Sequence, residues 1–147
     1  KSEADNKLIF TADGFFRTGD LARFDAEGNL IITGRRKDII NRGGDKVSAF
    51  AVEEIVVRYP GVQAAAVVGM PDPRLGERIC AYVQPVPGRA ISAAEVLSYL
   101  KEQGASGLLL PERIEIVPQL PLTAMGKVDK QRLREDIGQK LRAEGKA

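Results

Sequence analysis

The sequence contains no histidine and a single cysteine, Cys80, among its 147 residues. Without histidine, the chain lacks the usual base of Ser-His and Cys-His nucleophile pairs and the commonest metal ligand. One cysteine allows no internal disulfide, so the disulfide framework gives no argument for secretion and a cytoplasmic location is the default expectation. Cys80 lies in an apolar run, which favours a small core residue over a nucleophile.

Long hydrophobic runs and an excess of one charge are also absent. No apolar stretch approaches the length that crosses a bilayer, and the N-terminus has neither an initiating Met nor a signal-peptide core. The 22 basic and 20 acidic residues give a formal charge of +2, which argues against nucleic acid or an anionic membrane as partner. We therefore expect an ordinary globular domain, present as a fragment or processed piece of a longer protein.

Hydrophobic patterning predicts short strands that alternate with helices. Alternation from Asp20, turn residues at 27–29 and an apolar run at 30–32 predict a β-hairpin that Gly34 ends. Residues 1–19 show no amphipathic period and are expected to form a lead-in whose pair of phenylalanines contacts a missing neighbour. Further strands are expected at 62–70, 78–84 and 113–117, and helices at 49–59, from Ser92 to Gln103, and after Asp129.

The order of the elements is a hairpin followed by β-α-β-β-α-β-loop-α. Helices between short strands imply a small mixed β-sheet flanked by helices. The expected fold class is therefore α/β, or α+β, with a β-hairpin preceding the sheet.

Three segments carry residues suited to chemistry on anions. Lys127 follows a glycine between a proline-containing loop and a helix cap, and a lysine there can follow charge that builds on a phosphate or carboxylate oxygen. Residues 35–46 combine basic side chains with a Gly pair, so they form either an anion-binding loop or an exposed polar loop. Asp20 at a strand start either accepts hydrogen bonds from ribose hydroxyls or serves as a turn residue. Each segment alone favours the plainer alternative.

The order and spacing of these segments resemble the adenylate-forming enzymes, which include acyl-CoA synthetases, firefly luciferase and peptide-synthetase adenylation domains. GFFRTGD looks like the ribose-binding segment of that family. GRRKDIINRGGDKV, followed by the helix containing VEEI, looks like its hinge and thioester-forming segment. PLTAMGKVDKQRLR looks like its terminal segment with the catalytic lysine. INRGGDKVSA, PDPRLGERICAYV and PLTAMGKVDK look most like stand-alone enzymes that activate 2,3-dihydroxybenzoate or salicylate for siderophore assembly.

The resemblance implies roles for particular residues in the use of ATP. Asp20 would bind the ribose hydroxyls, and Arg35 would contact the ribose or the nearby phosphate. Lys46 matches a basic position near the AMP phosphate. Lys127 would sit between the carboxylate of the acid and the α-phosphate of ATP. Mg²⁺ would bridge the phosphates and would be bound mainly by another domain, so no metal ligand is expected here.

The resemblance also implies a switch between two half-reactions. Lys37 would be the hinge about which the small domain rotates, and Gly44 would line the passage for a pantetheine thiol. Residues 1–36 would then be the end of a large N-terminal domain, and residues 37–147 the mobile C-terminal domain. The expected partners are that N-terminal domain, an aryl carboxylic acid and a carrier protein with phosphopantetheine. The chain alone is expected to be inactive.

Two alternatives remain open at this point. An acyl-CoA synthetase of other acid specificity would share Lys127 and Lys37 but use free CoA as acceptor. A module that binds a carrier protein without catalysis would have no use for Lys127, which speaks against it.

Overall fold

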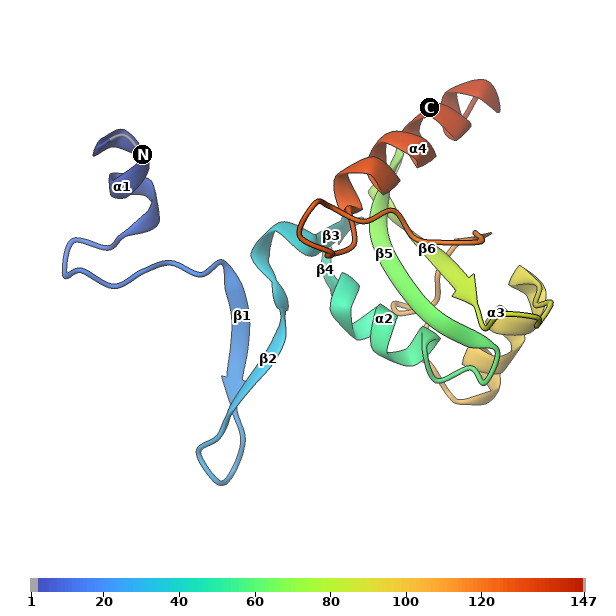
Figure 1. The fold of residues 1–147 in the computed structure, drawn as a ribbon, viewed down its shortest axis with the longest axis horizontal. Coiled ribbons are helices and arrows are strands. Elements are labelled where there is room, and N and C mark those ends of the chain that lie inside the picture. Colours follow the sequence, from blue (N-terminus) through green and yellow to red (C-terminus); the bar gives the residue numbers. More distant parts are fainter. Residues whose placement is uncertain (1–2, 147) are drawn as a thin grey trace.

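The computed structural model describes residues 3–146, with side chains described from residue 6 onward. An N-terminal portion with a hairpin projects from a body of sheet and helices (Figure 1). The elements are α1 (Glu3–Ile9), β1 (Asp20–Phe24), β2 (Leu30–Arg35), the 3₁₀ turn η1 (Arg36–Asp38), β3 (Ile39–Arg42), β4 (Asp45–Ser48), α2 (Ala49–Val56), β5 (Val62–Asp72), β6 (Gly76–Pro85), α3 (Ala93–Glu102), β7 (Arg113–Ile116) and α4 (Lys130–Ala143). No helix within residues 3–146 is long and apolar enough to cross a membrane.

The expected hairpin is confirmed, but its second strand is longer than predicted. β1 and β2 pair antiparallel, and the register places Asp20 opposite Arg35. The prediction that Gly34 ends the strand is therefore wrong, because the strand continues to Arg35. A bulge lies at this point, because Leu21 pairs with Gly34 while Ala22 pairs with Ile32, which leaves Thr33 as the extra residue.

The charged segment after the hairpin is folded rather than a loop, so the expectation of a polar loop over residues 35–46 was wrong. It contains η1 and a second hairpin, β3–β4. Gly43 and Gly44 both have positive φ, 59° and 99°, which a two-residue type I′ turn requires. Ile40 and Val47 face each other across the two strands and are buried. These two apolar residues therefore hold the basic segment against the core.

The central sheet is built on the long antiparallel pair β5 and β6. The predicted strands 62–70 and 78–84 are confirmed, and each extends further in the structure. β7 joins β6 in parallel, and β3 meets the beginning of β6 where Arg42 pairs with Gly76. A mixed sheet with the hairpin in front of it agrees with the fold class expected from the sequence.

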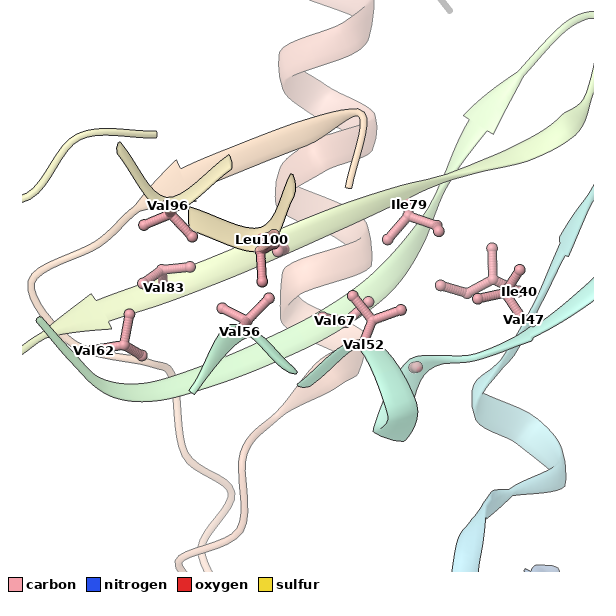
Figure 2. Close-up of a cluster of buried hydrophobic side chains, with 12 residues drawn as sticks. Ile40, Val47, Val52, Val56, Val62, Val67, Ile79, Val83, Val96 and Leu100 are labelled. Atoms are coloured by element: carbon pink, nitrogen blue, oxygen red, sulfur yellow. The ribbon is translucent and has the colours of Figure 1, made fainter. Parts of the chain in front are cut away.

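Both faces of this sheet are covered, which explains why β5 and β6 are apolar at successive positions. One set of side chains gathers with α2 and α3, and Figure 2 shows Val67, Ile79 and Val83 in this cluster. The alternate set, which includes Val68 and Tyr82, packs against α4. The body thus has a core on each side of one sheet.

The helix starts follow the predicted caps. Ser92 and Glu95 form a complete capping box at α3, and the Asp129 carboxylate accepts a hydrogen bond from the backbone of α4. α2 begins after Ser48 as expected but ends at Val56, three residues before the predicted end. α1 was not predicted, because seven residues in the lead-in are too few to display a helical period.

Candidate active site

A cleft of about 760 Å³ lies where the end of the hairpin, η1 and the beginning of α4 meet. Arg35 and Lys37 line one part of it, and Lys127, Lys130 and Arg134 line another. The sequence separates these two groups by about ninety residues, so the fold assembles a cationic cleft from both ends of the chain. Such a cleft suits an anionic ligand such as a phosphate or carboxylate.

The backbone around Lys127 is held in a closed turn. The Thr123 amide donates to the Lys127 carbonyl at 2.7 Å, and the Lys127 amide lies 3.3 Å from Thr123 Oγ1. Gly126 has a φ of 75°, a left-handed conformation that favours glycine, which explains why a glycine precedes the lysine. The turn therefore presents an exposed Lys127 side chain in the cleft from a fixed backbone.

Asp20 and Arg35 form an ion pair at the base of the hairpin. Arg35 Nε donates to Asp20 Oδ1 at 2.8 Å, as the register of β1 and β2 allows. The Asp20 amide donates to Thr18 Oγ1 at 3.1 Å, and the Arg36 amide donates to the Gly19 carbonyl at 2.8 Å. Asp20 is thus oriented from both sides while its side chain stays 27% exposed, so it remains accessible to a ligand.

Three of the expected site residues do not line this cleft: Asp20 lines a neighbouring pocket with Arg35, and Gly44 and Lys46 lie on the next hairpin. Gly44 lies in the β3–β4 turn, and Lys46 on β4 donates to the Asn41 side chain on β3. A Cβ added at Gly44 would meet no atom within 4 Å, so the surface beside this turn is open. The structure therefore brings Lys127 together with Arg35 and Lys37, and leaves Gly44 and Lys46 on a separate hairpin.

A cluster of charged residues at one side of the cleft was not predicted from the sequence. Arg134 donates to Asp38 Oδ1 at 2.8 Å, and Lys130 lies 3.7 Å from Asp38 Oδ2. Lys130 also pairs with Glu53 Oε1 at 2.7 Å, and that oxygen accepts the Val67 amide at 2.7 Å. Lys130 and Arg134 are four residues apart, which places them on one face of α4. This spacing is the feature of the sequence from which the cluster could have been predicted. This cluster ties α4 to η1 and α2.

The acidic residues at the cleft do not fit the Mg²⁺ that the resemblance implies. Asp38 is engaged by Arg134 and Lys130, and Asp129 caps α4 by accepting the Arg132 amide at 3.2 Å. Residues 3–146 contain no group of three or more Cys, Asp or Glu residues that could hold a metal ion. The cleft in this chain is instead suited to the anionic groups themselves.

Comparison with known proteins now identifies the family. The AMP-binding enzyme C-terminal domain matches residues 51–127 of this chain. The 2,3-dihydroxybenzoate-AMP ligase of Bacillus subtilis is 46% identical over 97% of this chain and 26% of its own length. A Streptomyces salicylyl-CoA synthase / salicylate adenylyltransferase is 47% identical over 90% of this chain and 24% of its own. The salicyl-AMP ligase / salicyl-S-ArCP synthetase of Mycobacterium tuberculosis is 42% identical over 93% and 24%.

Solved structures give the same result for the fold. ATP-bound MatB from Rhodopseudomonas palustris aligns with a TM-score of 0.82 and 37% identity, over 91% of this chain and 26% of that protein. The apo form of the same protein aligns with a TM-score of 0.73 and 38% identity, over 91% and 26%. This chain spans about a quarter of the length of the relatives it matches. The chain belongs to the AMP-binding enzyme C-terminal domain family.

Proposed function

We propose that this chain is the C-terminal part of an aryl-acid–AMP ligase that acts on 2,3-dihydroxybenzoate or salicylate in siderophore biosynthesis. The enzyme uses ATP to make an acyl-adenylate and passes the acyl group to the pantetheine thiol of a carrier protein. The observation that carries this proposal is the cleft that Lys127 and Arg35 line together, with Asp20 paired to Arg35 beside it. The names of the Bacillus and Mycobacterium relatives support the choice of acid.

The first half-reaction needs no base, because a carboxylate is already ionised at neutral pH. A carboxylate oxygen attacks the α-phosphate of ATP, the new O–P bond forms, and pyrophosphate leaves. Both reactants are anions, and negative charge grows on the phosphoryl oxygens, so positioning and positive charge supply the catalysis. Lys127 lies between the carboxylate and the α-phosphate, Asp20 binds the ribose hydroxyls, and Arg35 contacts the ribose or phosphate. Lys46 supplies positive charge near the AMP phosphate.

The second half-reaction requires a different arrangement of the same chain. The carrier thiol attacks the acyl carbon, a thioester forms and AMP leaves. Lys127 would obstruct the thiol, so residues 37–147 rotate about Lys37 relative to residues 1–36 and present the open surface beside Gly44. The higher TM-score against the ATP-bound than the apo form of MatB supports an adenylation-like arrangement here.

The remaining parts of the enzyme would lie outside this chain. A large N-terminal domain supplies the acid pocket and most contacts to ATP and Mg²⁺, and without it the chain is inactive. The enzyme works in the cytoplasm, without nucleic acid or membrane. A CoA-dependent reaction is the second candidate, and the name of the Streptomyces relative supports it, because that protein is called a CoA synthase.

Acid-dependent ATP–pyrophosphate exchange in the full-length protein tests the proposal. The panel contains salicylate, 2,3-dihydroxybenzoate, benzoate and a fatty acid, and free CoA and an aryl carrier protein are then compared as acceptors. Exchange with a hydroxybenzoate and transfer to the carrier protein are expected. Exchange with the fatty acid alone would discard the aryl-acid assignment, and transfer to CoA alone would favour the second candidate. If no acid supports exchange, the alternative of a non-catalytic module is tested next by measuring binding to a carrier protein.

A further inference from the structure

The hydroxyl of Ser48 links the hairpin to the body. Ser48 Oγ donates to the Thr33 carbonyl on β2 at 2.9 Å, and it accepts from the Ala51 amide at 3.4 Å as the cap of α2. One side chain thus serves two contacts, and only the capping contact is internal to the body. Outside η1, no other hydrogen bond or ion pair joins residues 8–36 to residues 37–146.

The hairpin is shaped to make this contact. Thr33 is the extra residue of the bulge in β2, and bulges re-aim backbone groups at the edges of sheets. The next residue is Gly34, where an added Cβ would lie 2.7 Å from Ser48 Oγ. Only a glycine therefore allows β2 to approach Ser48 this closely, which explains a glycine inside the strand.

The contact lies on a path between the two groups of cleft residues. Arg35 follows Gly34 directly on the hairpin side. On the other side, Ser48 begins α2, α2 carries Glu53, and Glu53 pairs with Lys130, three residues after Lys127. The position of Ser48 against β2 therefore sets where the Lys127 turn lies relative to Arg35.

We propose that Ser48 is a positioning residue for adenylation: its hydrogen bond to the Thr33 carbonyl holds the body in the orientation that places Lys127 at the Arg35 side of the cleft. The proposal rests on the function proposed above. Rotation about Lys37 breaks this bond, and both groups then bind water instead. A single neutral hydrogen bond has a modest net strength, which suits a contact that must open in every catalytic cycle.

Two substitutions separate the contact from the helix cap. Ser48→Ala removes both, whereas Ser48→Asp keeps a good N-cap but presents a carboxylate that cannot donate to the Thr33 carbonyl. Ser92→Ala is the matched control, because it removes the cap of α3, which lies on the side of the body away from the hairpin (Figure 1). ATP–pyrophosphate exchange and acyl transfer from supplied acyl-adenylate are measured separately on the full-length variants.

The expected result is a fall in exchange of about threefold to tenfold for both Ser48 variants, with acyl transfer unchanged or faster. Ser92→Ala should leave the ratio of the two rates at the wild-type value. Normal exchange in Ser48→Asp would show that only the cap matters and would overturn the proposal. Equal losses in both half-reactions, or no loss in either, would overturn it as well.

A distance measurement separates failure of this proposal from failure of the proposed function. Cys80 is buried, so spin labels at Glu27→Cys in the β1–β2 turn and Gln139→Cys on α4 report the arrangement of hairpin and body. Ser48→Asp should broaden the distance distribution, and Ser92→Ala should not. If the wild type shows no exchange with any acid but this broadening is found, the contact stands and the assigned reaction falls. An unchanged distribution in Ser48→Asp would overturn the contact itself.

Discussion

The hairpin and the body of this chain are stabilised in different ways. In the hairpin, Phe24 and Leu30 are 71% and 60% exposed, and order comes from strand pairing and from the ion pair of Asp20 with Arg35. In the body, Ile79 and Val52 are completely buried between a sheet and its helices. The candidate site takes residues from both. The structure therefore combines a body that has its own core with a hairpin whose apolar side chains lie on the surface.

The largest expected effect is on the stability of the body. Ile79→Ala removes a fully buried side chain from the cluster in Figure 2, and we expect the free energy of unfolding to fall by about 2–5 kcal/mol. Phe24→Ala in the hairpin should change it by less than about 0.5 kcal/mol, because the side chain is exposed in this chain. Urea unfolding of both variants measures the difference. Equal losses would remove the distinction between the two regions.

A smaller effect is expected where α4 is tied to η1. Asp38→Asn removes the charge that faces Arg134 and Lys130, and we expect a loss of about 1–2 kcal/mol in the free energy of unfolding. The control is Asp45→Asn at the exposed start of β4. Urea unfolding at neutral pH compares the two. A loss no greater than in the control would show that α4 is held by its apolar face alone.

Acid should weaken the body through Glu115 on β7. Burial alone would raise the pKa of Glu115, but hydrogen bonds from Lys140 and Arg113 outweigh it and lower the pKa below 4.5. A carboxyl whose pKa is lower in the folded state stabilises the fold above its unfolded pKa and loses this contribution as the pH falls through the folded value. We expect stability to decline as the pH falls through the acidic range, with a smaller decline in Glu115→Gln than in the wild type. Parallel pH profiles of the two proteins would contradict the assignment.

The smallest expected effect is the reaction of the buried Cys80 thiol with a thiol reagent in the folded chain. Burial raises the pKa of its thiol to about 12, so very little thiolate exists at pH 8. A thiol reagent should leave the folded chain unmodified for hours and label it at once in urea. Rapid labelling of the native protein would show that the α4 side of the sheet opens readily.

The sequence predicted the elements with strong local patterns. The capping box at Ser92, the apolar run of β6 and the apolar face of α4 all appear where expected. The β3–β4 hairpin was not predicted, because the many charged residues of this segment obscure its apolar pattern. Ile40 pairs with Val47 across a Gly-Gly turn. The bulge at Thr33 has no signal in the sequence of the hairpin, and its carbonyl accepts a hydrogen bond from Ser48, which lies later in the chain.

The sequence predicts candidate site residues but does not show how the fold assembles them. Asp20, Arg35 and Lys127 were predicted through the resemblance, while the cleft that Arg35 and Lys127 share depends on how α4 lies against η1. The roles of Asp38 and Glu53 had no sequence signal, because a carboxylate that binds a lysine from a distant helix looks like any surface acid. Tertiary contacts therefore decided this part of the structure.

The most direct test of the central claim is the exchange activity of Lys127→Ala in the full-length protein, with the acid that supports the wild type. If Lys127 stabilises the charge that develops between carboxylate and α-phosphate, exchange should fall by about 100-fold or more. Lys101→Ala, on the exposed side of α3, should retain wild-type exchange. Exchange within about twofold of the wild type in Lys127→Ala would contradict the catalytic assignment of this residue.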